Sequence, residues 1–184
     1  LKKLKPVEPE KDGRLPVYLE AVKRCVDAIG NEVFVVPVIG APFTTSAALR
    51  GTETFIKELY TDPELVHAVM KVATQSVKNL IDAYVKAGSV PVTVEPVATG
   101  SMISEKHFRE FVLPYLKEVY AHIHSFSLPG VLHICSKTKR VIQCMAESGA
   151  DILSIDNIDL LEAKALVGDK VCLMGNVSPV DGML

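Results

Sequence analysis

Short apolar segments alternate with longer amphipathic ones along most of the chain. Apolar residues at helical spacing predict helices over 15–29, 61–88, 104–125, 138–148 and 160–167. Continuous apolar runs of strand length predict strands over 32–40, 90–95, 131–135, 151–156 and 170–176. Strands that alternate with helices are typical of parallel β-α-β units. No GxGxxG turn follows any of these strands, which argues against a dinucleotide-binding sheet.

The predicted strands also alternate between aliphatic and polar residues, and polar residues gather near the carboxyl ends. In a (β/α)8 barrel the inward face of these ends lines the active site, whereas the outward face packs on the helices. We therefore expect Val92, Val94, Leu132, Ile134, Leu153 and Ile155 to face the helices. Inward positions are then predicted for Glu95, His133, Cys135, Asp156 and Asn176. The alternative for the carboxylates and the amide is that they cap the helices or loops that follow.

His133 and Cys135 lie two residues apart at the end of one predicted strand, so their side chains share a face. An imidazole and a thiolate are two of the ligands that zinc prefers, and catalytic zinc sites commonly have three protein ligands. Asp156, at the next strand end, offers an oxygen, and a second thiolate would have to come from beyond Leu184. The alternative is a buried structural cysteine beside a core histidine.

Composition narrows the class of protein. The chain has 184 residues, close to half of them hydrophobic, which suits one domain over residues 1–184. With 20 basic and 22 acidic residues and no basic run, neither a nucleic acid nor a membrane is an expected partner. The absence of a bilayer-length apolar segment, of a signal peptide and of disulfide-like cysteine spacing favours the cytoplasm. The chain begins with Leu1 and stops just after a strand, so we expect it to be part of something longer.

Several stretches resemble the uroporphyrinogen decarboxylase superfamily and, within it, the corrinoid-dependent methyltransferases that include methylcobalamin:coenzyme M methyltransferases. The stretches run in family order, and they are Gly40-Ala41-Pro42-Phe43-Thr44, Glu95-Pro96 with Ile103-Ser104, His133-Ile134-Cys135, Gly149-Ala150-Asp151 through Ile155-Asp156, and Gly175-Asn176-Val177-Ser178-Pro179. The HxC element distinguishes the methyltransferases from the true decarboxylases. Ser136 departs from the pattern, because a Gly usually follows this element.

The resemblance implies a TIM barrel, present here as an incomplete barrel with about five parallel strands. It implies zinc bound by His133, Cys135 and a later cysteine beyond Leu184, with Asp156 as the carboxylate near the metal. Asp156 and Glu95 are then the expected catalytic residues, and the expected substrate-binding residues are Phe43, Thr44 and Asn176. The implied reaction moves a methyl group between a corrinoid, methylcobalamin on a partner corrinoid protein, and a small-molecule thiol or similar acceptor or donor.

Two other functions remain open at the level of the sequence. One is a porphyrinogen decarboxylase, which needs no metal and in which a buried HxC has no role. The other is a non-catalytic barrel that holds a corrinoid-protein partner without turnover. Zinc content distinguishes the first from the methyltransferase, and an assay of methyl transfer distinguishes the second.

Overall fold

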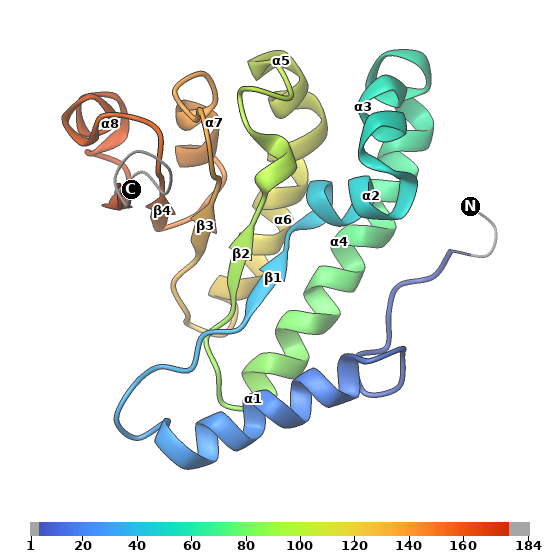
Figure 1. The fold of residues 1–184 in the computed structure, drawn as a ribbon, viewed down its shortest axis with the longest axis vertical. Coiled ribbons are helices and arrows are strands. Elements are labelled where there is room, and N and C mark those ends of the chain that lie inside the picture. The colour runs from blue at the N-terminus through green and yellow to red at the C-terminus, as the bar shows by residue number, and fades with distance from the viewer. Residues whose placement is uncertain (1–3, 177–184) are drawn as a thin grey trace, which may run out of the picture.

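The computed structural model describes residues 4–176 and shows one parallel sheet with helices packed against it (Figure 1). The sheet has five strands in the order β1-β2-β3-β4-β5, so each strand pairs with its neighbour in sequence. The strands are β1 (Val38–Gly40), β2 (Val92–Val94), β3 (Val131–His133), β4 (Ile152–Ser154) and β5 (Cys172–Met174). Sequential parallel order is the arrangement of strands in a (β/α)8 barrel, so the prediction of an incomplete barrel is confirmed.

A helix forms in each predicted segment, but the one predicted over 138–148 is reduced to residues 142–146, and two further helices follow β1. The helical elements are α1 (Leu15–Ile29), α2 (Pro42–Arg50), α3 (Thr52–Thr61), α4 (Pro63–Lys86), the 3₁₀ turn η1 (Pro96–Ala98), α5 (Glu105–His107), the π-helical turn η2 (Phe108–Val112), α6 (Leu113–His124), α7 (Ile142–Ala146) and α8 (Leu160–Val167). Asp62 caps α4 by accepting a hydrogen bond from the backbone N–H of Leu65. The predicted helix over 104–125 is interrupted because Pro114, near the start of α6, cannot continue a regular helical ladder.

The buried face of the sheet packs against the helices, and in Figure 1 α6 runs behind β1 and β2 while α4 lies beside β1. Leu132, Ile134, Leu153 and Ile155 are buried on this face, as the alternation predicted. The prediction for β2 was wrong, however. Thr93 pairs in register with Leu132, so Thr93 faces the helices and Val92 and Val94 do not. Thr93 is tolerated there because its hydroxyl lies 2.6 Å from the Tyr120 hydroxyl of α6.

The opposite face of the sheet is the one that a closed barrel would enclose. Gly40, Val94, His133, Ser154 and Met174 lie side by side on it at one level of the register. Val38 is 63% exposed and Met174 is 51% exposed, so this open face is largely uncovered by the described residues. We call it the open face below. Within residues 4–176, no helix is both long enough and apolar enough to cross a membrane.

Candidate functional site

His133 and Cys135 occupy the carboxyl end of β3. His133 is partly buried, and its register partner on β4 is Ser154, so the two side chains share the open face. The Nδ1 atom of His133 lies 3.0 Å from the Ser154 hydroxyl oxygen. Cys135 follows two residues later with a partly buried free thiol. The predicted pairing of a soft nitrogen and a soft sulfur donor on one face is therefore compatible with the structure.

Asp156 and Asn176 lie together, in a cleft next to the turn that follows Cys135. The cleft has a volume of about 620 Å³ and is lined by Ser136, Lys137, Asp156, Asn157, Ile158, Asp159 and Asn176. The Asp156 carboxylate accepts a hydrogen bond from the backbone N–H of Asn157 at 2.6 Å. The side-chain amide of Asn176 donates to the carbonyl oxygen of Ile158. Both residues are thus held at the ends of β4 and β5, where the sequence predicted a polar site.

The described residues do not complete the predicted zinc site. Among residues 4–176 no three His, Cys, Asp or Glu side chains are placed to hold one metal ion. Asp156 therefore does not complete a three-ligand set with His133 and Cys135 in this structure. The donor chemistry of His133 and Cys135 still fits two of the positions of a tetrahedral zinc ion, with further ligands needed from elsewhere. The predicted later cysteine lies outside the described residues, as do residues 177–179 of the Gly175–Pro179 motif.

Glu95 follows β2 directly and shares the parity of Thr93, so its side chain is on the face that packs against the helices. Its carboxylate is fully buried and accepts hydrogen bonds from the backbone N–H groups of Phe43, at 2.9 Å, and Thr44, at 2.7 Å. Both groups belong to the first turn of α2, whose N-cap residue Ala41 provides no side-chain acceptor. Burial raises the pKa of Glu95 to about 7. The prediction that Glu95 points inward was wrong, and the capping alternative describes its contacts.

The two other predicted substrate-binding residues belong to the same buried corner. Phe43 is fully buried and packs edge to face on Phe55, with ring centroids 5.0 Å apart. Its side chain is therefore a core group, and substrate contact through it does not agree with this structure. Thr44 is partly buried, and its hydroxyl oxygen accepts a hydrogen bond from the backbone N–H of Val97 at 3.4 Å. The Gly40–Thr44 motif thus joins α2 to the end of β2.

Sequence reasoning missed Ser154 as a partner of His133 and missed Lys137 and Asn157 as residues that line the cleft. Their positions relative to the strand ends could have identified them. Ser154 shares the inward parity of Asp156 on the same strand, and Lys137 and Asn157 follow directly after strand ends, where side chains of a barrel site gather.

The complete chain, residues 1–184, matches the sequence profile of the family described as uroporphyrinogen decarboxylase (URO-D). The chain belongs to the uroporphyrinogen decarboxylase family. It is 30% identical to a methylated-thiol–coenzyme M methyltransferase of Methanosarcina mazei over 97% of its own length and 48% of the relative's. It is 28% identical to the methylcobamide:CoM methyltransferase MtaA of Methanosarcina barkeri, over 94% of this chain and 51% of that protein.

Decarboxylases are similar to the chain at comparable identity. The uroporphyrinogen decarboxylase of Aromatoleum aromaticum is 30% identical over 94% of this chain and 51% of that protein. Among solved structures, a methyltransferase from Methanosarcina mazei superposes with a TM-score of 0.90 at 28% identity, covering 97% of this chain and 53% of that one. This family member therefore spans about half the length of the relatives it matches, and it shares their fold over that half.

The backbone conformation of the position after the HxC element favours a glycine. Ser136 has a φ of +67°, in the left-handed region that only glycine adopts without cost. We expect Ser136→Gly to raise the free energy of unfolding by about 1 kcal/mol, measured by urea denaturation. Ser125→Gly is the matched control, because Ser125 has a φ of −62°, and there the substitution should not stabilise. Equal effects of the two substitutions would remove the conformational explanation.

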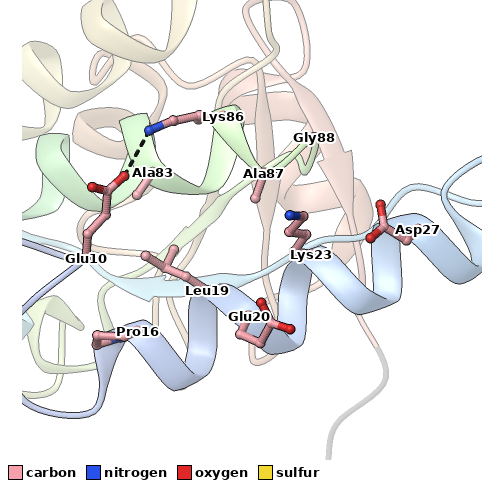
Figure 2. Close-up of a pocket in the computed structure, with 10 residues that line it drawn as sticks. All are labelled: Glu10, Pro16, Leu19, Glu20, Lys23, Asp27, Ala83, Lys86, Ala87 and Gly88. Carbon is pink, nitrogen blue, oxygen red and sulfur yellow. Dashed lines mark hydrogen bonds and ion pairs between the residues drawn. The ribbon is translucent and has the colours of Figure 1, made fainter.

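A second cleft of this uroporphyrinogen decarboxylase family member lies at the other end of the sheet. It has a volume of about 520 Å³ between α1 and the end of α4, and Figure 2 shows its lining, including the ion pair between Glu10 and Lys86 at 2.9 Å. Active sites of (β/α)8 barrels lie at the carboxyl ends of the strands, whereas this cleft is next to Gly88, which precedes β2. We therefore place the functional site at the strand ends and not in this cleft.

Proposed function

We propose that this protein is a zinc-dependent methyltransferase that moves a methyl group between a corrinoid and a thiol or similar acceptor. The observation that carries the proposal is His133 on the open face at the end of β3, with the free and partly buried thiol of Cys135 two residues later. Support comes from the similarity to methyltransferases named for methylated thiols and methylcobamide. We further propose that the third zinc ligand is a cysteine beyond Leu184, which agrees with relatives about twice as long as this chain.

The residues of the site would act by holding ligands and substrate in place. A hydrogen bond between Nδ1 of His133 and Ser154 fixes the orientation of the ring and leaves Nε2 as the nitrogen free to bind a metal. Bound zinc would convert a substrate thiol, with an ordinary pKa of about 8.5, into a thiolate at neutral pH. Asp156 and Asn176 line the adjoining cleft, where we propose that Asp156 accepts the proton of the thiol and Asn176 contacts the acceptor. A corrinoid protein would present the methyl group at this end of the barrel.

The competing function is tetrapyrrole decarboxylation, because several relatives of similar identity are named uroporphyrinogen decarboxylases. Decarboxylation has no use for a histidine and a cysteine on one face at a strand end, so the HxC element favours methyl transfer. A non-catalytic barrel that only binds a corrinoid protein has no feature of its own in its favour.

The test uses a form of the chain that continues past Leu184, supplied with zinc, methylcobalamin and 2-mercaptoethanesulfonate. We expect the absorbance of methylcobalamin to change as the corrinoid loses its methyl group, with equimolar formation of the methyl thioether. We expect no decarboxylation of uroporphyrinogen III by the same preparation. Decarboxylation without methyl transfer would establish the competing function, and neither activity would reject both enzyme assignments.

The role of Ser154 can be tested without measuring enzyme activity. Replacing it by Ala removes the hydrogen-bond partner of His133 Nδ1 and should lower zinc affinity by about 10- to 100-fold, the usual loss for a residue that orients a metal ligand. Competition against a chromogenic chelator measures the affinity. Ser125→Ala is the control, because Ser125 is exposed at the end of α6. Unchanged zinc affinity in Ser154→Ala would mean that the hydrogen bond does not orient the ligand.

A further inference from the structure

The loop after the HxC element carries three positive side chains at the carboxyl end of the sheet. Lys137, Lys139 and Arg140 line a cleft of about 550 Å³ together with Gly100, Ser101 and Asn157. Among residues 4–176, no acidic side chain lines this cleft. Lys139 forms an ion pair with Glu162 at 2.5 Å, whereas Lys137 and Arg140 have no ion-pair partner among residues 4–176.

The backbone of the same loop has unused donors. Within the described part of the chain, none of the backbone N–H groups from Ser136 to Arg140 donates a hydrogen bond to another residue. Ser136 turns the chain through the left-handed region, and successive backbone N–H groups around such a turn form concavities that bind anions. The loop also holds the Thr138 hydroxyl, which is buried without a hydrogen-bond partner in residues 4–176.

Gly100 fixes this loop against the loop that follows β2. Its backbone N–H donates to the carbonyl oxygen of Lys137 at 3.1 Å, and the Thr99 hydroxyl donates to the same oxygen at 3.3 Å. A Cβ atom on Gly100 would lie 2.8 Å from that oxygen and 3.2 Å from the Cβ of Arg140. The cleft is therefore built by two interlocked loops and is not a chance gathering of mobile side chains.

We propose that this cleft is a binding site for an oxyanion, of the phosphate or sulfonate class, held by Lys137, Arg140 and the free backbone N–H groups of the loop. The proposal does not depend on the methyltransferase assignment. It adds an anion site that shares Lys137 and Asn157 with the cleft of Asp156 and Asn176. A ligand whose charged end occupies the basic cleft would therefore extend toward the polar cleft beside Cys135.

The test measures the dissociation constants of inorganic phosphate and of ethanesulfonate by isothermal titration calorimetry, at fixed ionic strength. Lys137→Gln and Arg140→Gln should each weaken binding by at least about tenfold, because each removes a charged hydrogen-bond donor. Lys71→Gln removes an exposed positive charge on α4 and should leave binding unchanged. The tighter of the two anions identifies whether the site is built for a phosphate or for a sulfonate.

Gly100→Ala tests whether the anion is held by the shape of the loop or only by its net positive charge. It keeps all three cations but displaces the loop, so it should weaken anion binding about as strongly as the loss of one cation, while urea denaturation confirms that the protein is folded. Absence of binding of both anions would overturn the proposal. Equal weakening by Lys71→Gln, or full binding by Gly100→Ala, would overturn it as well, because either result means that only net charge is sensed.

Discussion

Replacing Cys135 by Ser is expected to lower the zinc affinity of the protein by more than the roughly 10- to 100-fold that loss of an orienting residue costs. A thiolate binds zinc far better than a hydroxyl does, and the site has few ligands to lose. The measurement is competition with a chromogenic chelator, on the chain and on a form that continues past Leu184. The matched control is Cys25→Ser, because Cys25 is an exposed free thiol on α1.

Unfolding of the variant should not be the cause of the lower zinc affinity. Cys135 is only partly buried, and the core contacts at this end of β3 are made by Leu132 and Ile134, which are fully buried. We therefore expect Cys135→Ser to unfold at nearly the same urea concentration as the parent protein. If Cys135→Ser and Cys25→Ser bound zinc equally, the assignment of Cys135 as a ligand would be wrong.

Glu95 is expected to make the stability of the protein depend on pH. Burial raises the pKa of Glu95 to about 7 from an ordinary value of 4.5. Between these values the folded protein holds a proton that the unfolded chain has lost, so the free energy of unfolding falls as pH rises. The stabilisation from protonated Glu95 is therefore fully present below about pH 4.5 and lost above about pH 7. The size of the loss is on the order of 3 kcal/mol, since one pKa unit corresponds to about 1.4 kcal/mol.

Glu95→Gln isolates this contribution because the amide keeps one acceptor for the first turn of α2 and cannot ionise. Urea denaturation at pH 5 and pH 8 gives the free energy of unfolding of both proteins. Relative to the variant, the parent protein should lose stability between the two pH values. Glu118→Gln, at an exposed position of α6, should show no such difference. A parent and a Glu95→Gln variant with the same pH dependence would show that Glu95 is ionised in the folded state at both pH values.

The fold could be predicted from the sequence because parallel strands buried against helices leave a strong pattern. The apolar runs that contain Leu132, Leu153 and Leu173 all lie in the sheet, paired in the expected sequential order. For β2, the polarity of the side chains did not indicate which of them face the helices. Thr93 and Glu95 are polar yet face the helices, because Tyr120 and the first turn of α2 supply hydrogen-bond partners that lie 27 and 51–52 residues away in sequence.

Part of the candidate site could be predicted because the pattern of strands and helices also shows where each strand ends. His133, Cys135, Asp156 and Asn176 sit at strand ends, a position that the alternation of strands and helices fixes. Phe43 was predicted from the family motif alone, and a motif does not show whether a side chain contacts a ligand or fills the core. The basic cleft that we propose as an anion site was not predicted from the sequence, because its three cations are not a continuous basic run and only the fold brings them together with Gly100 and Asn157.

The most direct test of the central claim is the zinc K-edge absorption spectrum of a form of the chain that continues past Leu184. The account predicts zinc with one nitrogen and two sulfur neighbours from the protein, and one sulfur fewer in Cys135→Ser. A metal surrounded only by nitrogen and oxygen, with identical spectra in the two proteins, would contradict a zinc site built on His133 and Cys135.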